Sequence, residues 1–218
     1  MIKMKDRVEE ILSYLEQIFP DAHCELTYNK DYELLIAIVL SAQTTDKSVN
    51  KVTPILFDKY KTLESLANAS LEDIEEIIKS IGTFKKKSQF IKNIAISLVN
   101  DYNGIVPNDR TYLESLSGVG RKTTNVFLAE YYKVPTIAVD THVDRVSKRL
   151  KLAKESDSVS KVEQNLMKYI PKGKWIETHH RLIFFGRYMC KAIKPNCAEC
   201  KLKHLCKYYE KNKDRIVH

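Results

Sequence analysis

The sequence has few of the residues that interrupt helices or form turns. Its 218 residues include only 6 Gly and 6 Pro. This small share argues against a disordered chain and against a turn-rich all-β fold. The chain also lacks a long apolar segment, since its longest apolar run, residues 34–40, is far too short to span a bilayer. We therefore expect an ordered globular protein.

The N-terminus lacks the apolar stretch of a secretory signal, because its first residues, MIKMKDRVEE, are mostly charged. The expected location is the cytoplasm. The formal net charge is +8, and the segment 185–218 carries nine Lys and Arg against three Asp and Glu. Such a charge fits an anionic partner, of which nucleic acid is the commonest. A solvated Lys-rich surface has the same charge, so charge alone identifies no partner.

Apolar residues recur at helical spacing along most of the chain, and this pattern predicts an all-α fold. Residues 134–139 are the one strand-like run, and they have no partner strand. The short loops and the absence of internal repeats indicate a compact arrangement. The predicted helices cover residues 4–19, 32–40, 70–80, 84–102, 109–116, 121–132, 141–150, 159–170 and 174–190.

Four of the five cysteines lie close together near the C-terminus, with the spacing C-x6-C-x2-C-x5-C: Cys190, Cys197, Cys200 and Cys206. Clustered thiols in a cytosolic chain point to a metal centre rather than to disulfides. Structural zinc usually takes two tight C-x(2–4)-C pairs, and only one is present here. Four cysteines around one compact object suit a 4Fe–4S cluster better, although zinc stays open on spacing alone.

Two further expectations concern the thiols. The lysines that flank the cysteines are expected to help keep them deprotonated: Lys191, Lys194, Lys201, Lys203 and Lys207. Cys24 stands apart and has the character of a small buried apolar side chain.

The segment Leu116-Ser-Gly-Val-Gly-Arg-Lys-Thr-Thr124 joins two predicted helices through Gly118-Val119-Gly120. Glycines permit a very tight turn, and its backbone N–H groups at the start of the next helix can bind a phosphate. A plain helix connection would use the same glycines. The segment is no P-loop, because that motif requires Gly directly before Lys and a preceding strand.

Lys122 lies at the start of the helix that follows this hairpin. Taken alone, it is more typical of a lysine that contacts a DNA phosphate. Asp140 ends an apolar run directly before another predicted helix, where an N-cap is the simplest role. A lysine that can lose its proton beside a carboxylate that stabilises positive charge is, however, what imine chemistry at a sugar carbon requires.

These residues together resemble endonuclease III, the iron–sulfur DNA glycosylase and apurinic/apyrimidinic (AP) lyase family of the helix-hairpin-helix superfamily. The resemblance extends over essentially the whole chain. It rests on the four cysteines and on LLIAIVLSAQTTD (34–46), SIG (80–82), GVGRKT (118–123), TIAVDTHVDR (136–145) and GRY (186–188).

The resemblance implies a two-lobed helix-hairpin-helix DNA glycosylase fold with a C-terminal 4Fe–4S cluster loop. Residues 25–134 would form a six-helix lobe that contains the hairpin, and residues 1–24 plus 135–218 a second helical lobe that carries the cluster. DNA would bind across the groove between the lobes. The expected partner is double-stranded DNA with damaged bases or abasic sites, bound by a monomer at the nucleoid.

By similarity, Lys122 is the nucleophile and Asp140 the carboxylate that activates it. The four cysteines would ligate the cluster, and the basic loop 190–197 would contact phosphates. Gln43 and the loop 81–83 would fill the gap that a flipped base leaves. The residues expected to contact DNA are Gln43, Ile81, Thr83, Gly118, Val119, Gly120, Arg121, His142, Arg145, Lys191 and Lys194.

The chain departs from the family pattern at two positions. Thr83 stands where one well-known member of the family has Leu in the gap-filling loop, so gap filling is expected to depend more on Ile81, or lesion preference to differ. Ser117 stands where Pro is common. Neither change affects Lys122 or Asp140, and oxidised pyrimidines are the lesions the resemblance implies.

Two other functions stay open at this point. A monofunctional relative, such as the adenine glycosylase, generally lacks the hairpin lysine and often carries a further C-terminal domain. A non-catalytic DNA-binding module would use the hairpin and the cluster for docking alone. The presence of both Lys122 and Asp140 favours the bifunctional enzyme over either alternative.

Overall fold

The computed structural model describes residues 2–216, and within that range the secondary structure is helical with no β-strand. This confirms the predicted all-α class. The chain divides into two compact units. We call Glu25–Lys133 the central unit, and Met1–Cys24 together with Val134–His218 the terminal unit.

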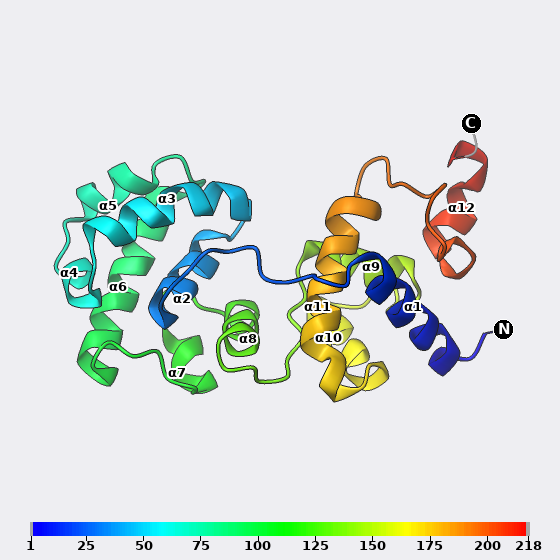
Figure 1. The fold of residues 1–218 in the computed structure, drawn as a ribbon, viewed down its shortest axis with the longest axis horizontal. Helices are drawn as coiled ribbons and strands as arrows, with labels where there is room; N and C mark the ends of the chain where they lie inside the picture. Colours follow the sequence, from blue (N-terminus) through cyan, green and yellow to red (C-terminus); the bar gives the residue numbers. More distant parts are fainter. Residues whose placement is uncertain (1, 217–218) are drawn as a thin grey trace. The chain divides into compact units, whose positions relative to one another are not determined.

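The central unit is built around α2 (Figure 1), which packs against α3, α6 and α8. Residues 32–40 of this helix are buried. The long helix α6 packs against α2, α4 and α5. Helix α8 packs against α2 and α7. The helices of this unit are α2 (Asp31–Leu40), α3 (Asp46–Lys59), α4 (Leu63–Ala67), α5 (Leu71–Ile78), α6 (Phe84–Tyr102), α7 (Arg110–Ser115) and α8 (Arg121–Glu130).

The terminal unit joins the first helix of the chain to the last third of the sequence. Its core gathers apolar side chains from α1, α9, α10 and α11, together with Leu202 and Leu205 from the cysteine segment. Its helices are α1 (Met4–Ile18), α9 (Thr141–Arg149), α10 (Val159–Tyr169), α11 (Trp175–Phe184) and α12 (Lys207–Ile216), with short turns at η1 (Lys172–Lys174) and η3 (Lys203–Leu205). Between α11 and Cys190 lies a π-helical turn, η2 (Phe185–Met189).

Local sequence explains where many of these helices begin. Six of them start at a Ser, Thr or Asp whose side chain accepts a hydrogen bond from a backbone N–H of the first turn, which satisfies a donor that the helix leaves unpaired. These N-cap residues are Thr45, Thr62, Ser70, Asp109, Asp140 and Ser158.

Some predicted elements need correction. The stretch 174–190 is not one α-helix, because it changes to the π-helical turn at Phe185. The stretch 134–139 has no regular secondary structure and pairs with no strand among the described residues. Three helices were not predicted at all: α3, α4 and α12. Pro54 lies inside α3, where a break is expected, and α12 has too few apolar residues to show a clear period.

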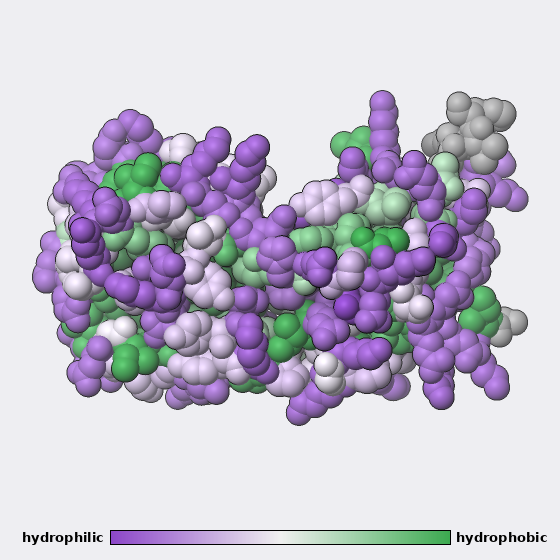
Figure 2. Space-filling model, viewed as in Figure 1, coloured by the Kyte–Doolittle hydropathy of each residue, from purple (hydrophilic) through white to green (hydrophobic). Residues whose placement is uncertain are grey.

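In the described part of the chain, no helix is both long and apolar enough to cross a membrane. Figure 2 shows a mainly hydrophilic face on which apolar side chains form separate patches. The largest exposed fraction among apolar side chains belongs to Ile193, in the loop between Cys190 and Cys197, at 81%.

Candidate active site and cysteine cluster

The predicted hairpin lies between α7 and α8 in the central unit. Gly118 has a φ of +75°, in the left-handed region that only glycine adopts readily. A Cβ at this position would lie 2.4 Å from a ring carbon of Phe90, on α6, so the turn also needs the absence of a side chain. Val119 is buried, and its N–H donates to the Leu116 carbonyl at 3.0 Å. The hairpin is therefore fixed against α6, with its Val119 side chain turned inward.

Helix α8 begins directly after the hairpin without a side-chain cap. Its N-cap is Gly120, which has no side chain to accept from the first-turn N–H groups. Arg121 and Lys122 follow as the first two residues of the helix, and both are exposed. A helix N-terminus of this kind carries partial positive charge and suits an anion. The geometry fits the phosphate site predicted for the hairpin.

Asp140 is the N-cap of α9 in the terminal unit. Its Oδ1 accepts hydrogen bonds from the backbone N–H groups of His142, at 2.9 Å, and Val143, at 2.8 Å. The other carboxylate oxygen takes no part in this capping, and the side chain is half-buried. The two roles weighed for Asp140 are therefore compatible, because one oxygen fixes the carboxylate while the other can face a substrate.

Arg145 lies one turn into α9, and its guanidinium bonds mainly to backbone carbonyls of the terminal unit. It donates to Gly186 O at 2.8 Å and to Cys190 O at 3.2 Å. Burial lowers the pKa of His142, whose Nδ1 lies 3.2 Å from an Arg145 nitrogen. Gly186 allows this close packing, since a Cβ there would lie 2.7 Å from the His142 Cβ. Arg145 and His142 thus connect α9 to the start of the cysteine segment.

The predicted gap-filling residues differ in exposure. Gln43 follows the end of α2 and Thr83 precedes α6, and both are exposed. Both also have left-handed backbones, with φ of 55° and 58°. Ile81, in contrast, is only 1% exposed, so its side chain belongs to the core in this conformation. The exposed positions available for gap filling are therefore Gln43 and Thr83.

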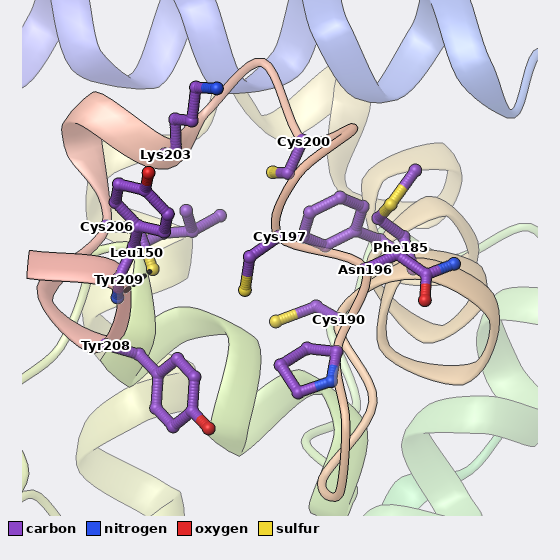
Figure 3. Close-up of a pocket in the computed structure, with 12 residues that line it drawn as sticks. Leu150, Phe185, Cys190, Asn196, Cys197, Cys200, Lys203, Cys206, Tyr208 and Tyr209 are labelled. Carbon is purple, nitrogen blue, oxygen red and sulfur yellow. Dashed lines mark hydrogen bonds between the residues drawn. The ribbon is translucent and has the colours of Figure 1, made fainter. Parts of the chain in front are cut away.

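The four clustered cysteines line one pocket of the terminal unit (Figure 3). In Figure 3 their sulfur atoms are turned toward a common space. Cys197 and Cys206 are buried, while Cys190 and Cys200 are half-buried. All five cysteines are free of disulfides, including Cys24.

The pKa values of three of these thiols are raised, whereas the flanking lysines were expected to lower them. Burial, together with neighbouring thiols, raises the pKa of Cys200 to about 11. Burial also raises the pKa of Cys197 and Cys206. The flanking lysines therefore do not keep these thiols deprotonated by themselves. Arg149 contacts the fourth thiol, because it donates to the Cys190 sulfur at 3.3 Å, and it stacks on the Tyr208 ring at 3.9 Å.

This donor set fits a 4Fe–4S cluster. Four thiols line one pocket, and their sulfur atoms are turned toward a common space. A single zinc requires all four sulfurs at about 2.3 Å from one point. A 4Fe–4S cube takes one thiolate at each of four separated irons and so needs a wider space. Bound iron would also compensate the charge that burial otherwise disfavours in the thiolates.

Two basic residues with several hydrogen bonds near these segments escaped the sequence interpretation. Arg149 also donates to the carbonyls of Lys191, at 2.8 Å, and Ala192, at 3.3 Å, and so holds the basic loop. Lys87 is a buried lysine whose contacts are described below. Arg149 follows Arg145 by one helical turn, which is a weak signal. Lys87 is the last of three consecutive lysines, and nothing in that run distinguishes it.

Comparison with known proteins shows which family the chain belongs to. Residues 36–172 match the family of HhH-GPD superfamily base excision DNA repair proteins. The chain is 49% identical to endonuclease III of Bacillus subtilis (strain 168) over 97% of this chain and 96% of that protein. It is 43% identical to endonuclease III of Escherichia coli (strain K12), over 93% and 95% respectively.

Solved structures agree with these relatives. A trapped endonuclease III–DNA covalent intermediate superposes with a TM-score of 0.94 at 51% identity, and covers 98% of this chain and 100% of that one. A thermostable thymine-DNA glycosylase superposes with a TM-score of 0.84 at 25% identity, over 94% and 98%. The matches extend over both units of the chain. The protein belongs to the endonuclease III family of base excision DNA repair proteins.

Proposed function

We propose that this family member is a bifunctional DNA glycosylase and AP lyase of base excision repair. Its substrate is double-stranded DNA with a damaged base, an oxidised pyrimidine by family resemblance, or with an abasic site. The observation that carries the proposal is an exposed Lys122 at the uncapped start of α8, in a chain that also has Asp140 held by its own helix. A monofunctional or non-catalytic relative has no need of the lysine.

Lys122 acts as the nucleophile. The lesion nucleotide leaves the base stack first, because its C1′ is inaccessible inside the duplex. The Lys122 amine attacks C1′, the C1′–base bond breaks, and the base leaves. The sugar ring opens to a protonated Schiff base between Lys122 and C1′. Loss of a C2′ proton then expels the 3′ phosphate, so that β-elimination cuts the strand 3′ to the lesion.

Asp140 supports these steps through its charge. Its carboxylate is held by two backbone hydrogen bonds, so no reorganisation is needed when positive charge develops at the sugar. It also favours transfer of a proton away from the Lys122 ammonium before attack. Lys122 belongs to the central unit and Asp140 to the terminal unit.

Binding is assigned to main-chain and basic groups. The hairpin of Gly118, Val119 and Gly120 takes a backbone phosphate with Arg121, while Lys191 and Lys194 on the exposed loop contact others. His142 and Arg145 position the start of α9. Gln43 and Thr83 fill the gap beside the lesion. The enzyme acts as a monomer, in the cytoplasm at the nucleoid, where its DNA substrate lies.

The four cysteines of the terminal unit would hold a 4Fe–4S cluster. Its contribution when bound is structural, since it ties the chain from Cys190 to Cys206 into one fold. Arg149 joins that segment to α9 through the Cys190 sulfur and the Lys191 carbonyl. The exposed lysines of the loop are thereby held for phosphate contact.

Borohydride trapping tests the lyase. Wild-type protein mixed with abasic-site DNA and borohydride should give a covalent adduct, because the reagent reduces the Schiff base to a stable amine. Lys122→Ala should give none. The matched control is Lys92→Met, another helical lysine, which should trap as well as wild type. Absence of a wild-type adduct, or equal trapping by Lys122→Ala, would show that the lyase assignment is wrong.

Colour and metal content test the cluster. Purified protein should be yellow-brown, with iron and sulfide in equal amounts at about four of each per chain. Cys197→Ser should lose both iron and colour, whereas Cys24→Ser should keep them. A colourless wild-type protein with stoichiometric zinc would overturn the proposal.

A further inference from the structure

Lys87 is a buried lysine in the first turn of α6, only 3% exposed. Its Nζ donates to Leu40 O at 2.9 Å, to Ala42 O at 2.7 Å and to Thr44 Oγ1 at 3.0 Å. An ammonium has three donors, and all three are satisfied here. Burial lowers the pKa of Lys87. Burying a charged group costs free energy unless the group is well hydrogen-bonded. The burial of Lys87 therefore indicates a role other than that of a surface charge.

The acceptors of Lys87 surround one of the gap-filling residues. Ala42 and Thr44 are the two neighbours of Gln43, whose backbone has a φ of 55°. Non-glycine residues in this region are strained and persist only where their surroundings hold them. The ammonium of Lys87 donates hydrogen bonds to the residues on both sides of Gln43 and so holds its backbone.

The segment that carries Thr83 lies directly before Lys87 in the chain. Thr83 is the N-cap of α6 and has a φ of 58°. The Lys87 N–H donates to the Thr83 carbonyl at 3.1 Å, but this is the ordinary backbone bond of a helix and does not depend on the lysine side chain. What the side chain adds is a link from the first turn of α6 to the loop of Gln43.

A simpler role for Lys87 would be to neutralise the C-terminus of α2, where cations are favourable. The bond to Leu40 O, the last residue of that helix, satisfies such a role by itself. The bonds to Ala42 and Thr44 lie beyond the helix end. They do nothing for the helix, but they fix the backbone on either side of Gln43.

We propose that Lys87 is a positioning residue that presets Gln43 for the gap beside the flipped nucleotide. The inference rests on the proposed function, because it concerns the step that extrudes the lesion. With the Lys87 ammonium in place, the loop of Gln43 has its strained backbone before DNA binds. Without it, the free-energy cost of ordering that loop is added to the flipping step.

The test compares two lysines on α6. Lys87→Met keeps most of the side-chain volume and removes the donors. Lys92→Met removes a similar bond, since Lys92 Nζ donates to Ala69 O at 2.7 Å, but that bond holds a loop with no gap-filling residue. Each variant is assayed for single-turnover base release from a paired lesion and for trapping with preformed abasic-site DNA, which has no lesion pair to open.

Lys87→Met should slow base release by roughly 10-fold to 100-fold, as small displacements of positioning groups do, and should change trapping less than about threefold. Lys92→Met should change neither rate. Equal behaviour of the two variants, with the wild type active in both assays, would overturn the role of Lys87 and leave the proposed function intact. A wild type that neither releases base nor traps would instead overturn the proposed function.

Two further measurements guard against simple loss of folding. Amide hydrogen exchange of the free protein should be faster at residues 42–44 in Lys87→Met and unchanged there in Lys92→Met. Thr44→Val removes only one acceptor with little change in shape. Thr44→Val should also slow base release, by a smaller factor than Lys87→Met. The proposal would be contradicted if Thr44→Val released base at the wild-type rate and amide exchange in Lys87→Met were unchanged.

Discussion

Helices α8 and α9 begin in opposite ways, although each is associated with a proposed catalytic residue at its start. Helix α9 starts at Asp140, whose Oδ1 accepts two backbone N–H groups. Helix α8 starts at Gly120, which offers no side chain to cap it. The unpaired backbone N–H groups at a helix start therefore have a different use in each helix. In α9 they fix a carboxylate, and in α8 they are left for an anion from outside.

The difference explains how two simple residues acquire specialised roles. A carboxylate held at an N-cap is ready to stabilise positive charge without moving. A glycine at the N-cap leaves the partial positive charge of the helix for a DNA phosphate, and this brings the DNA backbone next to Lys122. The predictions below test this contrast, in order of expected effect.

The largest effect is expected from removing the charge at the start of α9. Asp140→Asn keeps an oxygen that can cap the helix, so DNA binding and thermal stability should stay close to wild type. Turnover should fall by roughly 10²-fold to 10⁴-fold, the range typical of a lost acid–base group. Asp140→Ala should lose as much activity and also about 1 kcal/mol of stability, because the cap is gone.

Single-turnover kinetics, DNA titration and thermal melts on both Asp140 variants separate the two roles. If Asp140→Asn keeps both DNA binding and wild-type turnover, while Asp140→Ala loses stability, the residue serves only as a cap.

The next effect comes from giving α8 the cap that α9 has. Gly120 has a φ of −109°, and a Cβ there would meet no atom within 4 Å, so a side chain fits. Gly120→Asp should change stability by only a few tenths of a kcal/mol, as Gly and Asp caps differ little. It should weaken DNA binding by roughly 10-fold or more, because the carboxylate takes the N–H groups and repels the phosphate.

Gly120→Asn is the matched control, since it caps in the same way without a charge. Fluorescence anisotropy with an abasic-site duplex measures both affinities. Wild-type affinity in Gly120→Asp would show that no phosphate binds at the start of α8.

A medium effect is expected within the hairpin. Gly118→Ala combines a φ of +75° with a clash against the Phe90 ring. It should lower the free energy of unfolding by about 1–3 kcal/mol. Gly120→Ala, only two residues away, meets neither obstacle and should stay within about 0.5 kcal/mol of wild type. Chemical denaturation measures both, and equal losses would mean that the close packing on Phe90 does not hold the hairpin.

The smallest effect is expected in the basic loop of the terminal unit. Lys191 is exposed, so Lys191→Ala should leave the fold unchanged. Binding should weaken for all DNA sequences alike, and the slope of log affinity against log salt should fall by about 1. An unchanged slope would indicate that Lys191 contacts no phosphate, and that the hairpin carries more of the electrostatic binding.

Much of the fold and part of the site could be predicted from local sequence. Helical periodicity identified most helices, and Ser70, Asp109 and Asp140 marked helix starts because an N-cap needs only its own first turn. Helix α12 was missed because its charged sequence, Lys207–Ile216, has too few apolar residues for a clear period. The buried state of Ile81 was missed as well, since burial depends on what packs against a residue and not on its neighbours in the chain.

The sequence by itself determined the chemical inventory of this protein. It showed four cysteines at a specific spacing, two glycines before a lysine, and an aspartate at a helix start, because each of these is a short-range pattern. Only the tertiary structure decided which cations are buried and what they hold. Lys87 reaches Leu40, 47 residues away, and Arg149 reaches Cys190, 41 residues away. Partners at that separation are brought together by packing of the whole unit, which no local pattern of charge encodes.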